Sequence, residues 1–151
     1  DARAQLGAVL SKLSIFQKYG PVYFDASSTE GVDIQAGIGY WTYADAPVEA
    51  GFSGAKTPET ATVDVPLTPG WNIIGNPFDS AVAFGDNLSV TRNGEKIPLS
   101  EAAGRGWVSG RIYRYDRDSE TYVALDTGGE MIPWEGYVIK AADAATLHIA
   151  K

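Results

Sequence analysis

Apolar and polar residues alternate along much of the chain with a period of two. The alternation is cleanest at residues 61–67, where Ala, Val, Val and Leu are separated by Thr, Asp and Pro. This period is typical of a strand with one buried face, and Pro66 favours a position near a sheet edge. Residues 70–75 form a shorter apolar run that ends at Gly-Asn-Pro, which predicts a buried strand with Trp71 in the core.

Most of the remaining pattern also predicts short strands. Asn93-Gly94, between two apolar segments, is a strong signal for a tight hairpin, because both turn residues need positive φ. A second hairpin is expected around residues 116–120. Further strands are expected at residues 14–17, 22–24, 39–43, 82–84, 88–92, 95–99, 112–115, 122–125, 136–140 and 146–150.

One segment has a helical period instead. Leu6, Val9, Leu10 and Leu13 recur at helical spacing and predict a short amphipathic helix over residues 2–13. A helix of two to three turns is marginal alone and must dock on something larger. The sequence therefore predicts an all-β, mainly antiparallel fold, a sandwich or partly open barrel of two related halves, with one N-terminal α-helix.

Two parts of the chain resemble each other. Residues 20–25 and 39–44 give an aromatic strand ending in Asp and then a Gly-Tyr strand; residues 110–116 and 136–141 repeat this order. We therefore expect a single module over residues 1–151, with repeat halves 1–56 and 57–151. The first half has no counterpart of residues 60–78. The boundary of an excerpt explains this gap, and so does a groove that accepts a strand from another chain.

Composition narrows the classes of function. The chain has 151 residues, a net charge of −7 and no Cys. The acidic balance argues against a nucleic-acid surface, and the lack of Cys rules out disulfides and thiolate metal sites. No apolar run approaches the length of about 20 residues that a membrane helix needs, so we expect no membrane insertion. The chain begins with Asp1, which we interpret as a processed product or an excerpt.

The run Gly70-Trp-Asn-Ile-Ile-Gly-Asn-Pro-Phe-Asp-Ser80 resembles a motif of secreted and cell-surface bacterial proteins. In that group a "GWNLIGNP" strand is followed by a "Y.YD...Y" hairpin and a "GYwvka...TL" pair, matched here by residues 113–122 and 136–149. The N-terminal half resembles the companion segment of that group, a helix followed by Val22-Tyr23 and by Gly37-Ile-Gly-Tyr-Trp41, so the resemblance covers most of the chain. It implies an extracellular or cell-surface accessory module beside catalytic, adhesive or sorting domains, and implies no enzyme activity. A Gly is usual where this chain has Trp134, so we expect an altered turn or an exposed aromatic there.

Exposed aromatic side chains are the first candidate for a ligand site, because their faces stack on the apolar faces of sugar rings. Trp107 and Trp134 stand beside Gly, charged or turn residues, and Tyr115 and Tyr122 flank a hairpin. These four residues are the candidate ligand-binding set. The alternative is that the aromatic residues fill a small β core.

Asp116, Asp118 and Glu120 alternate as oxygen ligands for calcium do, but the stretch lacks the Gly and the later Glu of an EF-hand loop. A solvated hairpin turn is the alternative, and calcium is the only cofactor considered. His148, the single histidine, lies between Leu147 and Ile149 and is expected to be a structural, outward-facing residue.

These patterns favour a non-catalytic extracellular accessory module with a structural, assembly or adhesion role in a larger bacterial protein. Its partners would be neighbouring domains or another protein chain. A carbohydrate-binding module, with a polysaccharide as ligand, is the first alternative. An enzyme with an unrecognised carboxylate site is the second.

Overall fold

The computed structural model of the chain describes residues 13–19, 22–25, 34–44, 46–47 and 54–151. These ranges hold strands and one short helix, α2 (Leu99–Gly104). The strands are β1 (Leu13–Tyr19), β2 (Val22–Asp25), β3 (Trp41–Ala44), β4 (Val63–Leu67), β5 (Gly70–Gly75), β6 (Val82–Ala83), β7 (Leu88–Arg92), β8 (Glu95–Pro98), β9 (Arg111–Asp116), β10 (Thr121–Asp126), β11 (Glu130–Met131), β12 (Gly136–Ala141) and β13 (Ala145–Ile149).

The strands form four sheets in which every neighbouring pair is antiparallel. Two sheets have four strands, in the orders β10-β9-β12-β5 and β4-β13-β7-β8. A third has the order β2-β1-β3, and β11 pairs with β6. The prediction of a mainly antiparallel all-β chain is confirmed. The predicted helix over residues 2–13 lies outside the described residues, apart from Leu13, which begins β1.

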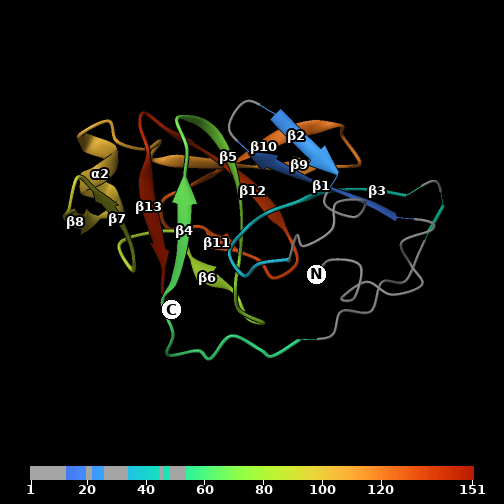
Figure 1. The fold of residues 1–151 in the computed structure, drawn as a ribbon, viewed down its shortest axis with the longest axis horizontal. Helices are drawn as coiled ribbons and strands as arrows, with labels where there is room; N and C mark the ends of the chain where they lie inside the picture. The colour runs from blue at the N-terminus through green and yellow to red at the C-terminus, as the bar shows by residue number, and fades with distance from the viewer. Residues whose placement is uncertain (1–12, 20–21, 26–33, 45, 48–53) are drawn as a thin grey trace.

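The two four-stranded sheets share one core (Figure 1). Alternate residues of β4, β7 and β13 point into it, and so do Ile112 on β9 and Ile139 on β12. The period-two pattern of residues 61–67 thus marks a real buried face. The largest fully buried side chains belong to Phe84, Ile74, Leu88, Leu99, Ile112, Met131, Ile139, Leu147 and Ile149.

Local turn chemistry agrees with the sequence. Asn93 and Gly94 have φ of 52° and 82°, as a two-residue turn of this hand requires, and they connect β7 to β8. Pro66 lies on β4, which is at the end of its sheet, as expected for a residue without a backbone N–H. Among the described residues, no helix is long and apolar enough to cross a membrane.

The prediction that Trp71 is buried in the core is wrong. Its side chain is 42% exposed, and its ring makes an edge contact with Tyr113, with 5.8 Å between the ring centroids. On β5 it is Ile74 that points into the core, so Trp71 and Ile73, at odd positions, face the other side. A run of consecutive apolar residues does not reveal which of them lie on the buried face.

The first part of the chain repeats the strand order of the second. β1 pairs with both β2 and β3, as β9 pairs with both β10 and β12. This order aligns β1 with β9, whereas the sequence match aligned the β2 segment with β9. The repeat halves 1–56 and 57–151 stay a prediction, and the topology offers a different register for comparing them.

Candidate functional site

A cleft of about 540 Å³ lies beside the carboxyl end of β5. Four separate parts of the chain build its walls: the segment that leads into β3, residues 54–57, the loop after β5, and the turn before β12. Its lining comes from residues 34–40, Thr42, residues 54–57, residues 75–79 and residues 134–136. Apolar surface, backbone groups and a few charged side chains meet here, which is typical of small-ligand sites.

One wall forms because two backbone segments approach closely. The amide of Gly39 donates to the carbonyl of Ile73 (3.1 Å), and the amide of Gly75 donates to the carbonyl of Gly37 (2.9 Å). A Cβ atom on Gly39 would lie 2.4 Å from Cγ2 of Ile73, so only glycine fits. These bonds fix the segment before β3 along the outer edge of β5.

Asn76 fixes the loop after β5, which also lines the cleft. Its Nδ2 group donates to the carbonyls of Ser80 and Met131, both at 2.8 Å, and its Oδ1 accepts from the amide of Phe78 at 2.9 Å. The last bond is a local side-chain turn of the kind asparagine favours. The Gly-Asn-Pro segment that ends β5 therefore stabilises the loop that follows the strand.

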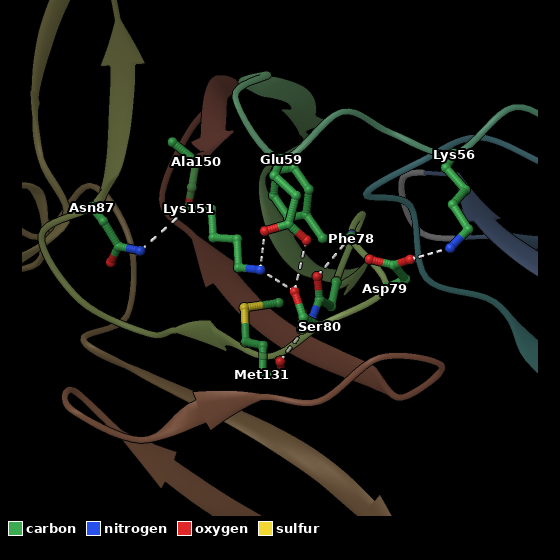
Figure 2. A network of polar contacts seen from close by, with 10 residues as sticks. Lys56, Glu59, Phe78, Asp79, Ser80, Asn87, Met131, Ala150 and Lys151 are labelled. Atoms are coloured by element: carbon green, nitrogen blue, oxygen red, sulfur yellow. Dashed lines mark hydrogen bonds and ion pairs between the residues drawn. The ribbon is translucent and has the colours of Figure 1, made fainter.

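Ion pairs tie the rim of the cleft to the chain terminus (Figure 2). Lys56 pairs with Asp79 at 2.5 Å, which lowers the pKa of the Asp79 carboxyl and raises that of the Lys56 ammonium. Glu59 accepts hydrogen bonds from Lys151 and, at 3.0 Å, from the Ser80 hydroxyl. These bonds, that from Lys151 above all, lower the pKa of Glu59. The exposure of these groups makes each pair a weak stabiliser.

Glu135 also lines the cleft. One carboxylate oxygen accepts from Nη1 of Arg114 at 2.9 Å, and the other accepts from the Tyr137 hydroxyl at 3.2 Å. The Tyr137 oxygen also accepts from the amide of Ile132 at 2.8 Å. Burial is the main cause that raises the pKa of Tyr137, and the pairing with Glu135 raises the pKa of Arg114. This network fixes the turn before β12.

Trp134 stands at the mouth of the cleft. Its side chain is 82% exposed and its backbone φ is 67°, in the left-handed region that favours glycine. The expectation of an exposed aromatic at this position is confirmed. The positive φ is one that glycine also adopts, so the expected altered turn stays a prediction. A strained backbone that presents an indole to solvent at a cleft is the kind of outlier that points to function.

The other three predicted ligand residues lie elsewhere. Tyr115 and Tyr122 contact each other with centroids 5.5 Å apart, and Trp41 of β3 makes edge contacts with both. Interplanar angles of 69° to 84° give no flat stacking platform. Trp107 packs against the core and carries the guanidinium groups of Arg92 and Arg105 at 5.7 and 5.4 Å. Of the four candidate ligand residues, the structure thus brings only Tyr115 and Tyr122 into contact with each other.

The predicted calcium ligands do not form a group. In the described part of the chain no cluster of three or more His, Cys, Asp or Glu side chains could hold a metal ion, and Asp116, Asp118 and Glu120 are all in that part. The turn between β9 and β10 closes on itself instead: the Ser119 hydroxyl donates to Asp116 at 2.5 Å, which lowers the pKa of that carboxyl.

His148 has partners that the sequence analysis missed. Its Nδ1 lies 2.6 Å from Oδ1 of Asp64, and its Nε2 lies 2.7 Å from Oγ1 of Thr91. Asp64 and His148 are directly opposite on β4 and β13, and β7 lies on the other side of β13. The alternation of polar and apolar residues could have indicated these contacts, because all three polar residues lie on the polar faces of half-buried strands.

The chain matches no known family model, no curated protein and no solved structure.

Proposed function

We propose that the chain is a non-catalytic β-sandwich accessory module of a larger extracellular bacterial protein, with a structural, assembly or adhesion role. The observation that carries the proposal is the setting of His148. Asp64, His148 and Thr91 are an acid, a base and a hydroxyl in contact, but they lie on the outer face of a sheet and join three strands. Their side chains serve as cross-strand ties.

The carboxylates of the cleft support the same proposal. A glycosidase acid needs a raised pKa. The pairing of Asp79 with Lys56 lowers the pKa of Asp79 instead. Glu135 is held by Arg114 and Tyr137, which favours a role in fixing the turn. The resemblance to modules of secreted proteins supplies the proposed location.

A turnover screen tests the non-catalytic assignment. The protein is incubated with chromogenic esters, glycosides and phosphoesters, beside variants Asp64→Asn and Asp79→Asn. We expect rates equal to those of buffer for all three proteins. Turnover that one of these substitutions abolishes, in a variant that keeps the native circular dichroism spectrum, would overturn the proposal.

Carbohydrate binding is a second candidate, favoured by Trp134. An exposed indole at the mouth of a cleft offers a stacking face, and backbone groups with Lys56 and Asp79 offer hydrogen bonds to hydroxyls. Only Trp134 of the four expected aromatic residues belongs to this cleft.

Trp134→Gly tests this candidate cleanly. Glycine suits the left-handed backbone, so the fold is kept while the ring is removed. A glycan array, followed by calorimetric titration with a soluble oligosaccharide that scores on it, would show binding that Trp134→Gly abolishes and Tyr122→Ala retains. Silence of the wild-type protein on the array, or equal binding by Trp134→Gly, would reject carbohydrate binding in this cleft.

A further inference from the structure

The chain has four asparagines, and their surroundings differ. An asparagine loses ammonia without an enzyme when the backbone nitrogen of the next residue attacks its side-chain carbon Cγ. The attack needs a nitrogen that carries a hydrogen and is not held in a hydrogen bond. It also needs a following residue with little bulk and a side-chain amide that is free to turn. The surroundings of each asparagine therefore decide whether it reacts.

Asn72 and Asn76 lack these conditions. Oδ1 of Asn72 accepts from the amide of Thr68, and its Nδ2 donates to the Thr68 carbonyl, both at 2.8 Å. The next residue, Ile73, is β-branched and belongs to strand β5. Asn76 is followed by Pro77, whose nitrogen carries no hydrogen. Both asparagines are therefore protected.

Asn87 is protected in part by its neighbour. The amide of Leu88 donates to the carbonyl of Gly85 at 2.9 Å, so this nitrogen is not free to attack. Nδ2 of Asn87 itself donates to the carbonyl of Ala150 at 3.2 Å. The attacking nitrogen and the side-chain amide are thus both held in place.

Asn93 meets the conditions that the other three fail. Asn93 and Gly94 are exposed at the tip of the turn between β7 and β8. Gly94 has no side chain, and open space surrounds the position that a Cβ would take. Among the described residues, neither the Asn93 side chain nor the Gly94 amide makes a hydrogen bond. The turn closes on its flanking pair, Arg92 and Glu95, which leaves the central amide free.

We propose that Asn93 deamidates and isomerises spontaneously in the folded protein. The nitrogen of Gly94 bonds to Cγ of Asn93, and the bond from Cγ to the side-chain nitrogen breaks. That nitrogen leaves as ammonia with the proton that Gly94 gives up. Water then opens the succinimide ring, at Cγ to give aspartate or at the backbone carbonyl to give isoaspartate. The proposal goes beyond the proposed function and does not rest on it.

The turn opens before the ring closes. Asn93 has a φ of 52°, and bringing the Gly94 nitrogen to Cγ requires rotation about the bond between Cα and the carbonyl carbon, which the closed turn restrains. β8 is a short strand at the end of its sheet and, in the described part of the chain, pairs only with β7. Opening of this hairpin therefore costs far less than unfolding the whole core.

Peptide mapping by mass spectrometry tests the site. Folded wild-type protein is held at mildly alkaline pH and body temperature and is sampled over weeks. We expect products at Asn93 to form at least about tenfold faster than at any of the other three asparagines. The matched Asn93→Gly variant suits the positive φ but has no side-chain amide, so it should gain no acidic form.

The same protein in urea gives the rate without the fold. An Asn93 that reacts in urea but stays intact in the folded protein would overturn the proposal, because the turn would then protect it. Acidic forms that accumulate equally in wild type and Asn93→Gly would also overturn it, because the change would lie elsewhere in the chain.

The products should also change the hairpin. Each replaces a neutral amide with a carboxylate, so the net charge of −7 becomes one unit more negative. Isoaspartate also adds one carbon atom to the backbone of a two-residue turn. We expect faster hydrogen exchange at the β8 amides in the isoaspartate fraction than in unreacted protein. Freshly purified Asn93→Asp has the charge without the extra atom and should resemble unreacted protein. Equal exchange in all three would overturn this effect on the turn.

Discussion

His148 and Asp64 face each other across β13 and β4, with 2.6 Å between Nδ1 and Oδ1. The histidine side chain is only 12% exposed, because the neighbouring strands flank it. Its second nitrogen contacts Thr91 on β7, so one imidazole bridges three of the four strands of its sheet. A residue whose sequence context offered no partner thus has two.

We expect His148→Ala to lower the free energy of unfolding by about 1–3 kcal/mol, because it removes two hydrogen bonds from a half-buried site. Asp64→Ala should cost less, about 0.5–1.5 kcal/mol, because the carboxylate is exposed. Urea denaturation of both single variants and the double variant measures the coupling. A coupling energy of zero would show that the contact does not stabilise the sheet.

Trp71 and Ile74 differ in burial although both belong to one apolar run. Ile74 is fully buried, so Ile74→Ala should cost about 2–5 kcal/mol. Trp71 keeps part of its ring in solvent, and Trp71→Ala should cost about 1–2 kcal/mol, below the range for emptying a core site. Chemical denaturation of the two variants checks the order. A larger loss for Trp71→Ala would contradict the assigned faces of β5.

The strands and turns were predictable because they depend on local pattern. Asn93-Gly94 specified its hairpin, and the alternation before Pro66 specified β4. The cleft was not predictable, because it depends on long-range contacts: Gly37 and Gly39 bond the segment before β3 to β5, and the pairing of β12 with β5 brings residues 134–136 beside residues 75–79. The exposure of Trp134 follows from its departure from a glycine, whereas nothing in the sequence shows that Tyr115 and Tyr122 lie outside the cleft.

Acid should destabilise the protein through carboxyls at the rim. The pKa values of Glu59 and Asp79 are lowered in the folded state from ordinary values of 4.5 and 3.8. The unfolded chain therefore binds protons first as pH falls, so the stabilisation is complete above these values and is lost as pH falls below them. Melting temperatures from roughly pH 6 to roughly pH 2 should decline, less steeply in Glu59→Gln than in Glu120→Gln. Equal slopes would contradict the pairing of Glu59 with Lys151.

Asn76 should matter more for stability than its polarity suggests. Asn76→Ala removes three hydrogen bonds and leaves the carbonyls of Ser80 and Met131 without this donor, at an expected cost of about 2–3 kcal/mol. Asn76→Asp keeps the acceptor for Phe78 but loses both donations, so it should not rescue stability. A melting temperature of Asn76→Asp equal to that of the wild type would contradict this stabilising role of the Asn76 side chain.

Gly39 decides whether the segment before β3 can lie against β5. Gly39→Ala would bring Cβ to 2.6 Å from the backbone oxygen of Ile74, as well as against Ile73, and backbone cannot yield as a side chain can. We expect a loss of at least about 1–3 kcal/mol. Faster hydrogen exchange at the Gly39 and Gly75 amides should accompany this loss, because both amides bond across this contact. The matched Gly104→Ala meets open space and should change stability little. Unchanged exchange at Gly75 in Gly39→Ala would show that the segment does not depend on this contact, and the cleft would lose one of its walls.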